Sequence, residues 1–138
     1  MITIIIPAYN CQSELISTLA SLPSRNEVKI IVVDDGSSKP LSAPADVTLI
    51  RHKHNKGVGA AFDTGVAACT TDKMILMGAD VIPEEGWLGK AVTLLDNHPM
   101  ALTCAICSGF SPKEPAFRPH RFLRYGAHIL RSHRRKVG

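Results

Sequence analysis

The chain has 138 residues, of which 45% are apolar and 20% are charged. This length and composition predict a single folded domain and exclude an intrinsically disordered chain. No apolar segment reaches the length of about 18 residues that a membrane span needs, and the first residues lack the basic flank of a signal peptide, so we expect a cytoplasmic protein.

Charge is unevenly distributed along the chain. Residues 1–117 carry nine basic and twelve acidic side chains, whereas residues 118–138 carry seven basic side chains and no acidic one. We therefore predict a domain over residues 1–117, followed by a basic C-terminal tail over residues 118–138. Such a tail could contact phosphate, a membrane surface or an acidic partner, or could simply be a solvated end.

The first half of the chain contains three short apolar runs and, between the first two, one helical pattern. A β-branched run predicts a strand over Ile2–Ile6, and Leu15, Ile16 and Leu19 mark one face of a helix that continues to about Leu22. Asn10 or Ser13 is the expected cap of that helix. Further strands are predicted over Val28–Val33 and Val47–Ile50.

The second half continues the alternation. It predicts a helix over Ala60–Cys69, a strand over Lys73–Met77, a helix from Pro83 to about Asn97 and a strand over Ala101–Ser108. Proline and acidic residues in a first turn favour the helix start at Pro83. The resulting order, βαββαβαβ, predicts an α/β fold whose mostly parallel sheet has helices on both faces.

Polar residues gather in the loops that follow three of these strands. Because ligands of such sheets bind at the carboxyl ends of the strands, we expect the loops to form one edge of a site. Tyr9 could stack on a flat ring, Asp34 or Asp35 could accept hydrogen bonds from a base or a sugar, and Asp80 could bind a hard cation.

Each of these side chains also has a purely structural interpretation. Asp34 and Asp35 could satisfy loop amides, Asp80 could cap a turn, and Tyr9 could be an ordinary loop aromatic. The pattern around His52 suggests a solvated strand end. Trp87 is expected in the core or at an interface rather than as a sugar platform.

Five motifs in order resemble those of the family 2 glycosyltransferases, inverting enzymes of the GT-A fold. They are Pro7-Ala8-Tyr9-Asn10, Val33 to Ser37, Asn55 and Gly57 with the small residues that follow, Gly78-Ala79-Asp80, and Pro83 to Leu88. The resemblance covers about residues 1–110. It implies a GT-A-like, Rossmann-related three-layer sandwich that holds the nucleotide-binding half of such an enzyme, with a truncated acceptor half.

The resemblance implies a glycosyltransferase that binds a nucleoside-diphosphate sugar, most often a UDP-sugar, through Mn²⁺ or Mg²⁺ and transfers the sugar to an acceptor hydroxyl. The positions that would bind the donor are Pro7, Ala8, Tyr9, Asp34, Asp35, Asn55, Gly57, Ala79 and Asp80. Asp80 would also bind the metal. The acceptor would be a saccharide, a lipid or a protein, and homo-oligomers are compatible with the pattern.

Two departures from the family pattern define the alternatives. Gly78 and Val81 stand where acids are usual, and we identify no catalytic base in the sequence. One alternative is a catalytically inactive nucleotide-sugar-binding or assembly module. Another is a scaffold whose basic tail binds nucleic acid or a membrane surface.

Overall fold

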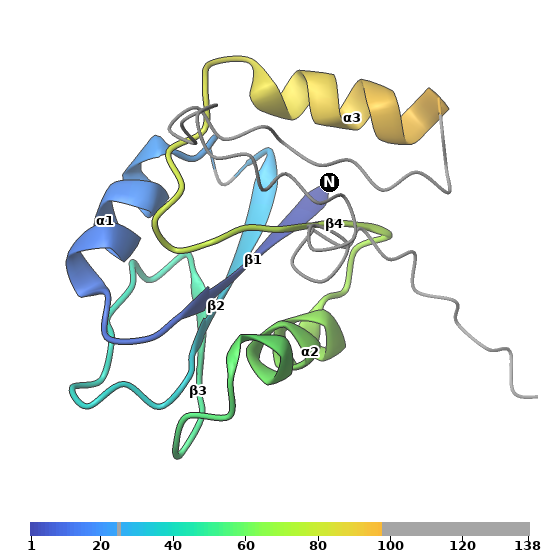
Figure 1. Cartoon of the computed structure of the whole chain (residues 1–138). Coiled ribbons are helices and arrows are strands. Elements are labelled where there is room, and N and C mark those ends of the chain that lie inside the picture. The colour runs from blue at the N-terminus through green and yellow to red at the C-terminus, as the bar shows by residue number, and fades with distance from the viewer. Residues whose placement is uncertain (25, 98–138) are drawn as a thin grey trace, which may run out of the picture.

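A computed structural model describes residues 1–24 and 26–97, except for the side chains of residues 94 and 95. The elements are β1 (Ile2–Ala8), α1 (Gln12–Ser21), β2 (Val28–Asp34), β3 (Thr48–Arg51), α2 (Val58–Ala68), β4 (Lys73–Leu76) and α3 (Trp87–Asn97) (Figure 1). This order confirms the predicted alternation as far as α3. The strand predicted over residues 101–108 and the basic tail lie outside the described residues.

The four strands form one parallel sheet in the order β3-β2-β1-β4. From β1 the chain first builds the sheet in one direction, through β2 to β3. It then crosses over through α2 and adds β4 on the other side of β1. The order of the strands therefore reverses between β1 and β4, which makes the carboxyl ends of these two strands the topological switch point of the sheet.

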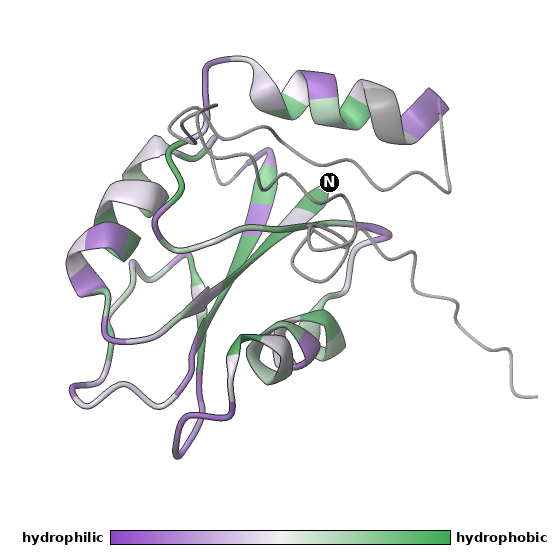
Figure 2. Cartoon of the chain, in the orientation of Figure 1, coloured by the Kyte–Doolittle hydropathy of each residue, from purple (hydrophilic) through white to green (hydrophobic). Residues whose placement is uncertain are grey.

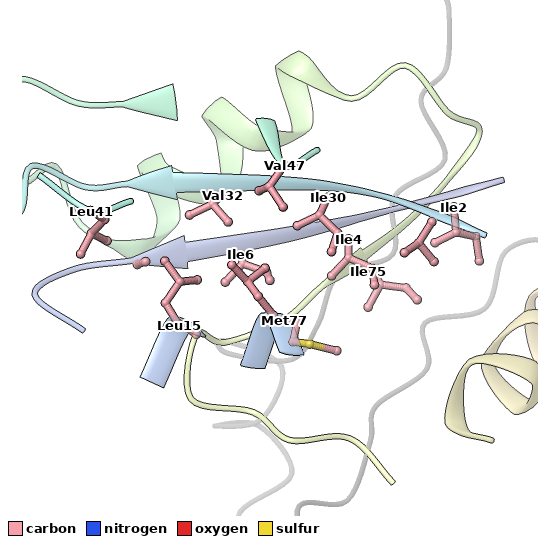
Figure 3. Packing of buried hydrophobic residues seen from close by; sticks show 14 residues of the cluster. Ile2, Ile4, Ile6, Leu15, Ile30, Val32, Leu41, Val47, Ile75 and Met77 are labelled. Carbon is pink, nitrogen blue, oxygen red and sulfur yellow. The ribbon is translucent and has the colours of Figure 1, made fainter. Parts of the chain in front are cut away.

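Alternate residues of β1, β2 and β4 point to opposite faces of the sheet, where they enter separate hydrophobic clusters. Ile4 and Ile6 pack with Leu15 of α1 in a cluster that also takes in Val32 (Figure 3). Ile5 faces the other side, where it packs with Phe62 of α2. Helices thus cover both faces of the sheet, which is why the strands are continuous apolar runs rather than alternating ones. Figure 2 shows this hydrophobic character along β1 and β2, with hydrophilic residues in the surrounding loops.

The predicted cap of α1 and the predicted start of α3 are wrong. Helix α1 begins after Cys11 without a side-chain cap, because the side-chain oxygen of Asn10 accepts a hydrogen bond from the Ser38 amide and the Ser13 hydroxyl donates to Glu14. Helix α3 begins at Trp87, four residues later than predicted. Residues 83–85 instead belong to the preceding loop, where the Glu84 carbonyl accepts from the Trp87 amide.

Other element boundaries shift only slightly. Helix α2 begins two residues before the prediction, and β2 extends by one residue to include Asp34. Trp87 packs partly buried against the α1-side core, as expected for a core residue. Within the described part of the chain, no helix is both long and apolar enough to cross a membrane.

Candidate functional site

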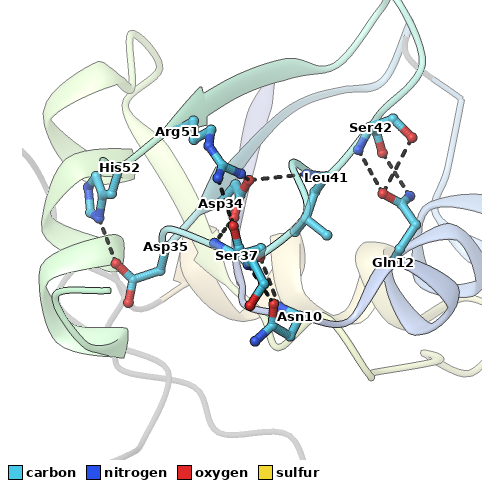
Figure 4. A network of polar contacts seen from close by, with 10 residues as sticks. Asn10, Gln12, Asp34, Asp35, Ser37, Leu41, Ser42, Arg51 and His52 are labelled. Atoms are coloured by element: carbon cyan, nitrogen blue, oxygen red, sulfur yellow. Dashed lines mark hydrogen bonds and ion pairs between the residues drawn. The ribbon is translucent and has the colours of Figure 1, made fainter. Parts of the chain in front are cut away.

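Asp34 ends β2 as a fully buried carboxylate, with 0% of the residue exposed. One oxygen accepts a hydrogen bond from the Ser37 amide at 2.9 Å, and the other accepts from the Leu41 amide at 3.1 Å and from the Arg51 guanidinium (Figure 4). Burial alone would raise the pKa of Asp34, but these hydrogen bonds outweigh it and hold the pKa below its ordinary value.

Asp35 is almost as buried and is bound by a different set of donors. Its Oδ1 lies 2.7 Å from His52 Nδ1 and accepts from the Lys56 amide at 2.9 Å, and its Oδ2 accepts from the Gly57 amide at 2.8 Å. Burial alone would raise the pKa of Asp35, but the hydrogen bonds from His52 and the two amides outweigh this effect and lower the pKa. The carboxylate therefore ties the end of β2 to the loop before α2.

The prediction that His52 sits at a solvated strand end is wrong. Its ring is buried, with only 6% of the residue exposed, and Nδ1 faces the Asp35 carboxylate (Figure 4). The Nε2 atom lies 2.8 Å from Thr64 Oγ1. Burial is tolerated because both ring nitrogens have a hydrogen-bond partner.

The first loop is tied to the second by its own polar groups. Asn10 has a φ of 51°, its amide donates to Ser37 Oγ at 2.8 Å, and its side-chain oxygen accepts from the Ser38 amide at 2.9 Å. Ala8 is buried, whereas 48% of Tyr9 is exposed. Tyr9 is therefore free to present its ring at the edge of the sheet, and its contact with a ligand stays a prediction.

An open cleft of about 790 Å³ lies at the switch point, at the carboxyl ends of β1 and β4. Three groups of residues line it: Pro7, Cys11 and Glu14 at the β1–α1 junction, Val58, Gly59 and Phe62 at the start of α2, and Leu76, Gly78, Ala79 and Asp80 after β4. The cleft therefore forms where both helical layers meet the edge of the sheet.

Three of the nine predicted site residues line this cleft, namely Pro7, Ala79 and Asp80. The other six are not among its lining residues: Ala8, Tyr9, Asp34, Asp35, Asn55 and Gly57. Cys11, Glu14, Val58 and Phe62 were not predicted. The signal that could have found them is the reversal of strand order, since it places the starts of α1 and α2 beside the end of β4.

The cleft is acidic at its rim. Asp80 is exposed, and its Oδ1 lies only 2.8 Å from the position that a Cβ atom on Gly78 would occupy. Glu14 contributes a second carboxylate. Burial raises the pKa of the nearby Cys11 thiol, and the charges of Glu14 and Asp80 raise it further. Burial and these charges thus disfavour the thiolate form of Cys11.

The parallel sheet, its reversed strand order and this cleft define a doubly wound α/β domain, and the cleft lies at the switch point, where sheets of this kind bind their ligands. The profile of Glycosyl transferase family 2 matches residues 3–137. The chain belongs to this family, which confirms the resemblance in its motifs.

Similar proteins agree with that assignment. A pre-mycofactocin glycosyltransferase of Mycobacterium tuberculosis is 41% identical over 93 residues, covering 63% of this chain and 19% of the relative. An uncharacterized glycosyltransferase of Bacillus subtilis is 28% identical over 114 residues, covering 75% of this chain and 29% of the relative. The chain thus spans less than a third of the length of these relatives.

Two solved structures share the fold. Staphylococcus aureus TarS, residues 1–349, superposes with a TM-score of 0.67 at 18% identity, covering 83% of this chain and 38% of that one. A Pyrobaculum calidifontis mannosyltransferase, in complex with GDP-Man and Mn²⁺, superposes with a TM-score of 0.62 at 20% identity, covering 89% of this chain and 37% of that one. These similarities confirm the predicted GT-A architecture.

Proposed function

We propose that this chain binds a nucleoside-diphosphate sugar in the switch-point cleft and forms the donor half of a glycosyltransferase. The observation that carries the proposal is the position of the cleft, with the exposed carboxylate of Asp80 at the carboxyl end of β4. Family membership supports this ligand class. TarS has been solved with UDP-GlcNAc and the mannosyltransferase with GDP-Man and Mn²⁺, so UDP-sugars are the first donors to test.

The donor set fits a hard divalent ion that the ligand itself helps to bind. No cluster of three or more metal-ligating side chains occurs among the described residues. Of the two carboxylates that line the cleft, Glu14 and Asp80, we assign the ion to Asp80, because the family resemblance places the metal motif there. Mg²⁺ is commonly bound by one or two carboxylates together with substrate phosphates and water, so a single aspartate suffices. When bound, Mn²⁺ or Mg²⁺ would neutralise charge on the diphosphate leaving group.

The chain's own residues would bind and orient the donor. Val58 and Phe62 provide an apolar wall, and the exposed ring of Tyr9 at the sheet edge can stack on a base. Asp34 and Asp35 act mainly through the loops, because their oxygens accept hydrogen bonds from the chain itself. By holding these loops in place, the two carboxylates would fix the backbone that faces the nucleoside.

Calorimetric titration tests this proposal. Wild-type protein is titrated with UDP-GlcNAc, UDP-glucose and GDP-mannose, with and without Mn²⁺. We expect one donor to bind in the presence of Mn²⁺, and Asp80→Asn to weaken that affinity about tenfold or more because a charged ligand of the ion is lost. Asp72→Asn is the matched control, because Asp72 is exposed in the turn before β4, at the opposite end of that strand.

Three outcomes separate the possibilities. If no donor binds to the wild type, the proposed function is wrong. If Asp80→Asn binds as well as Asp72→Asn, the metal assignment is wrong and the cleft assignment must rest on other residues. If the donor binds but its sugar is neither hydrolysed nor transferred, the chain is the binding or assembly module suggested by Gly78 and Val81.

A further inference from the structure

A buried hydroxyl group in α1 is hydrogen-bonded to the segment that carries Asp80. Thr18 is 0% exposed and shares the buried face of α1 with Leu15 and Leu19. Its hydroxyl donates to the Ala79 carbonyl at 2.7 Å, although 61 residues separate the two in the chain. Because a carbonyl can only accept, the direction of this hydrogen bond is fixed. The bond therefore ties α1 to the residue directly before Asp80.

The surroundings of this hydrogen bond make it costly to lose. Leu15, Leu19, Met77 and Ala79 belong to one hydrophobic cluster, and Ala79 is only 7% exposed. A buried hydroxyl and a buried carbonyl both need a partner, and here each is the partner of the other. The Ala79 carbonyl also belongs to the same planar peptide group as the Asp80 amide. The hydrogen bond thus fixes the peptide plane from which the Asp80 side chain leaves the backbone.

The residue on the other side of Ala79 leaves room for the carboxylate. Gly78 lines the cleft, and a Cβ atom there would lie 2.8 Å from Asp80 Oδ1 and 3.4 Å from Val81 Cγ2. The Asp80 carboxylate therefore folds back over residue 78, into space that any side chain at that position would take. Because this contact involves the end of a flexible side chain, a larger residue would turn the carboxylate away without disrupting the fold.

We propose that Thr18 and Gly78 are positioning residues of the donor site, which together fix the Asp80 carboxylate at the carboxyl end of β4. Thr18 acts on the backbone through the Ala79 carbonyl, and Gly78 acts on the side chain through the space that it leaves. The proposal rests on the proposed function for its effect on ligand affinity. A carboxylate that is already in place loses less conformational entropy when a divalent ion and a diphosphate bind.

Two variants test these two effects separately. Thr18→Val keeps the size and branching of the side chain but removes the donor, and Thr18→Ser restores it. Gly78→Ala adds only the Cβ atom that would meet Asp80 Oδ1, and Gly78 is not in a left-handed conformation that would exclude alanine. Thr93→Val is the matched control, because the exposed Thr93 hydroxyl donates to the Gly89 carbonyl of its own helix.

The first measurement needs no ligand. In NMR spectra of the full chain, vicinal couplings report the side-chain rotamer of Asp80, and the carbonyl carbon shift of Ala79 reports the hydrogen bond from Thr18. We expect one Asp80 rotamer in the wild type and in Thr93→Val, and a different rotamer in Gly78→Ala. We expect Thr18→Val to shift the Ala79 carbonyl upfield and to average the Asp80 couplings, and Thr18→Ser to reverse both changes. Averaged couplings in the wild type, or unchanged couplings in either Thr18→Val or Gly78→Ala, would overturn the proposal.

The second measurement is the affinity for UDP with and without Mn²⁺. We expect Thr18→Val and Gly78→Ala to bind UDP about fivefold more weakly than the wild type when Mn²⁺ is present, and to differ by less than about twofold when it is absent. Thr18→Ser and Thr93→Val should follow the wild type. A purely structural role would weaken binding equally with and without the metal, and that result contradicts the proposal.

The two measurements also separate this proposal from the proposed function. If Thr18→Val does not fold, the rotamer of Asp80 and the UDP affinity in Gly78→Ala still decide. If UDP does not bind to the wild type, the proposed function is wrong, whereas the couplings of Asp80 still show whether Thr18 and Gly78 hold its carboxylate in place.

Discussion

At the scale of single residues, Asp34 shows how this fold stabilises a buried charged side chain. It is fully buried, yet every contact it makes stabilises the ionised form: two amides and a guanidinium donate to it. Its partner Arg51 keeps 37% of its side chain exposed, so the ion pair is partly screened by solvent. The Ser37 and Leu41 amides are buried, and Asp34 is the acceptor for both. The Asp34 carboxylate therefore holds the conformation of the loop over residues 34–41.

Removing this carboxylate should therefore be costly. We expect Asp34→Ala to lower the free energy of unfolding by roughly 3 kcal/mol, because it leaves buried donors without an acceptor. Urea unfolding followed by circular dichroism measures the loss. Asp72→Ala, at an exposed position, should change stability by less than about 0.5 kcal/mol. Similar values for the two variants would mean that Asp34 is not the centre of the loop.

The two lowered carboxylate pKa values also predict an acid response. Because Asp34 and Asp35 have pKa values below 3.8 in the folded state, the unfolded chain binds their protons more tightly. Their contribution to stability is thus complete above the ordinary pKa and is lost as the pH falls through the lowered folded-state values. The urea midpoint should start to decline below about pH 5. Asp35→Asn should show a shallower decline than Asp72→Asn, and an identical slope would contradict the assignment.

At the level of elements, the close approach of α2 to β1 depends on a glycine. A Cβ atom at Gly65 would lie 2.2 Å from Ile5 Cγ2, so no other residue fits without moving the helix away from the sheet. Since Phe62, one turn earlier, lines the cleft, the same displacement would change the shape of the site. Packing and ligand binding are therefore linked through one helix.

Gly65→Ala tests this link. The better helix propensity of alanine offers about 1 kcal/mol, but overpacking against Ile5 should outweigh it and give a net loss of roughly 2 kcal/mol in thermal or urea unfolding. Gly89→Ala in α3 is the control, because a Cβ there meets nothing within 4 Å and should stabilise the protein slightly. If both variants are stabilised alike, α2 does not pack as described.

The sequence predicts elements better than it predicts their ends and contacts. Continuous apolar runs such as Val28–Val33 identify buried strands, because strand burial on both faces leaves a local pattern. The start of α3 was misplaced since Pro83 and the acids after it suit a loop as well as a first helical turn. The burial of His52 was missed for a different reason: its partner Asp35 lies 17 residues away, and no local pattern records that contact.

For the whole molecule, topology explains where the site lies. The motif residues predicted as one edge do gather at the carboxyl ends of the strands, but the cleft itself is confined to the point between β1 and β4 where strand order reverses. Asp80 therefore lines the cleft, whereas Asp34 and Asp35 lie at the end of β2, on the other side of β1 from β4. The basic tail over residues 118–138 and a further strand over residues 101–108 lie outside the described residues and stay predictions.

Mapping of a bound nucleotide tests the central claim, a donor site in the switch-point cleft, most directly. Amide spectra of the wild-type chain are recorded on addition of UDP and GDP with Mg²⁺, and again with Mn²⁺ to broaden signals close to the ion. We predict that the largest shifts fall at Cys11, Val58–Phe62 and Gly78–Asp80, with broadening centred on Asp80. Shifts that concentrate at the amino-terminal edge of the sheet, or no shifts with either nucleotide, would contradict the account.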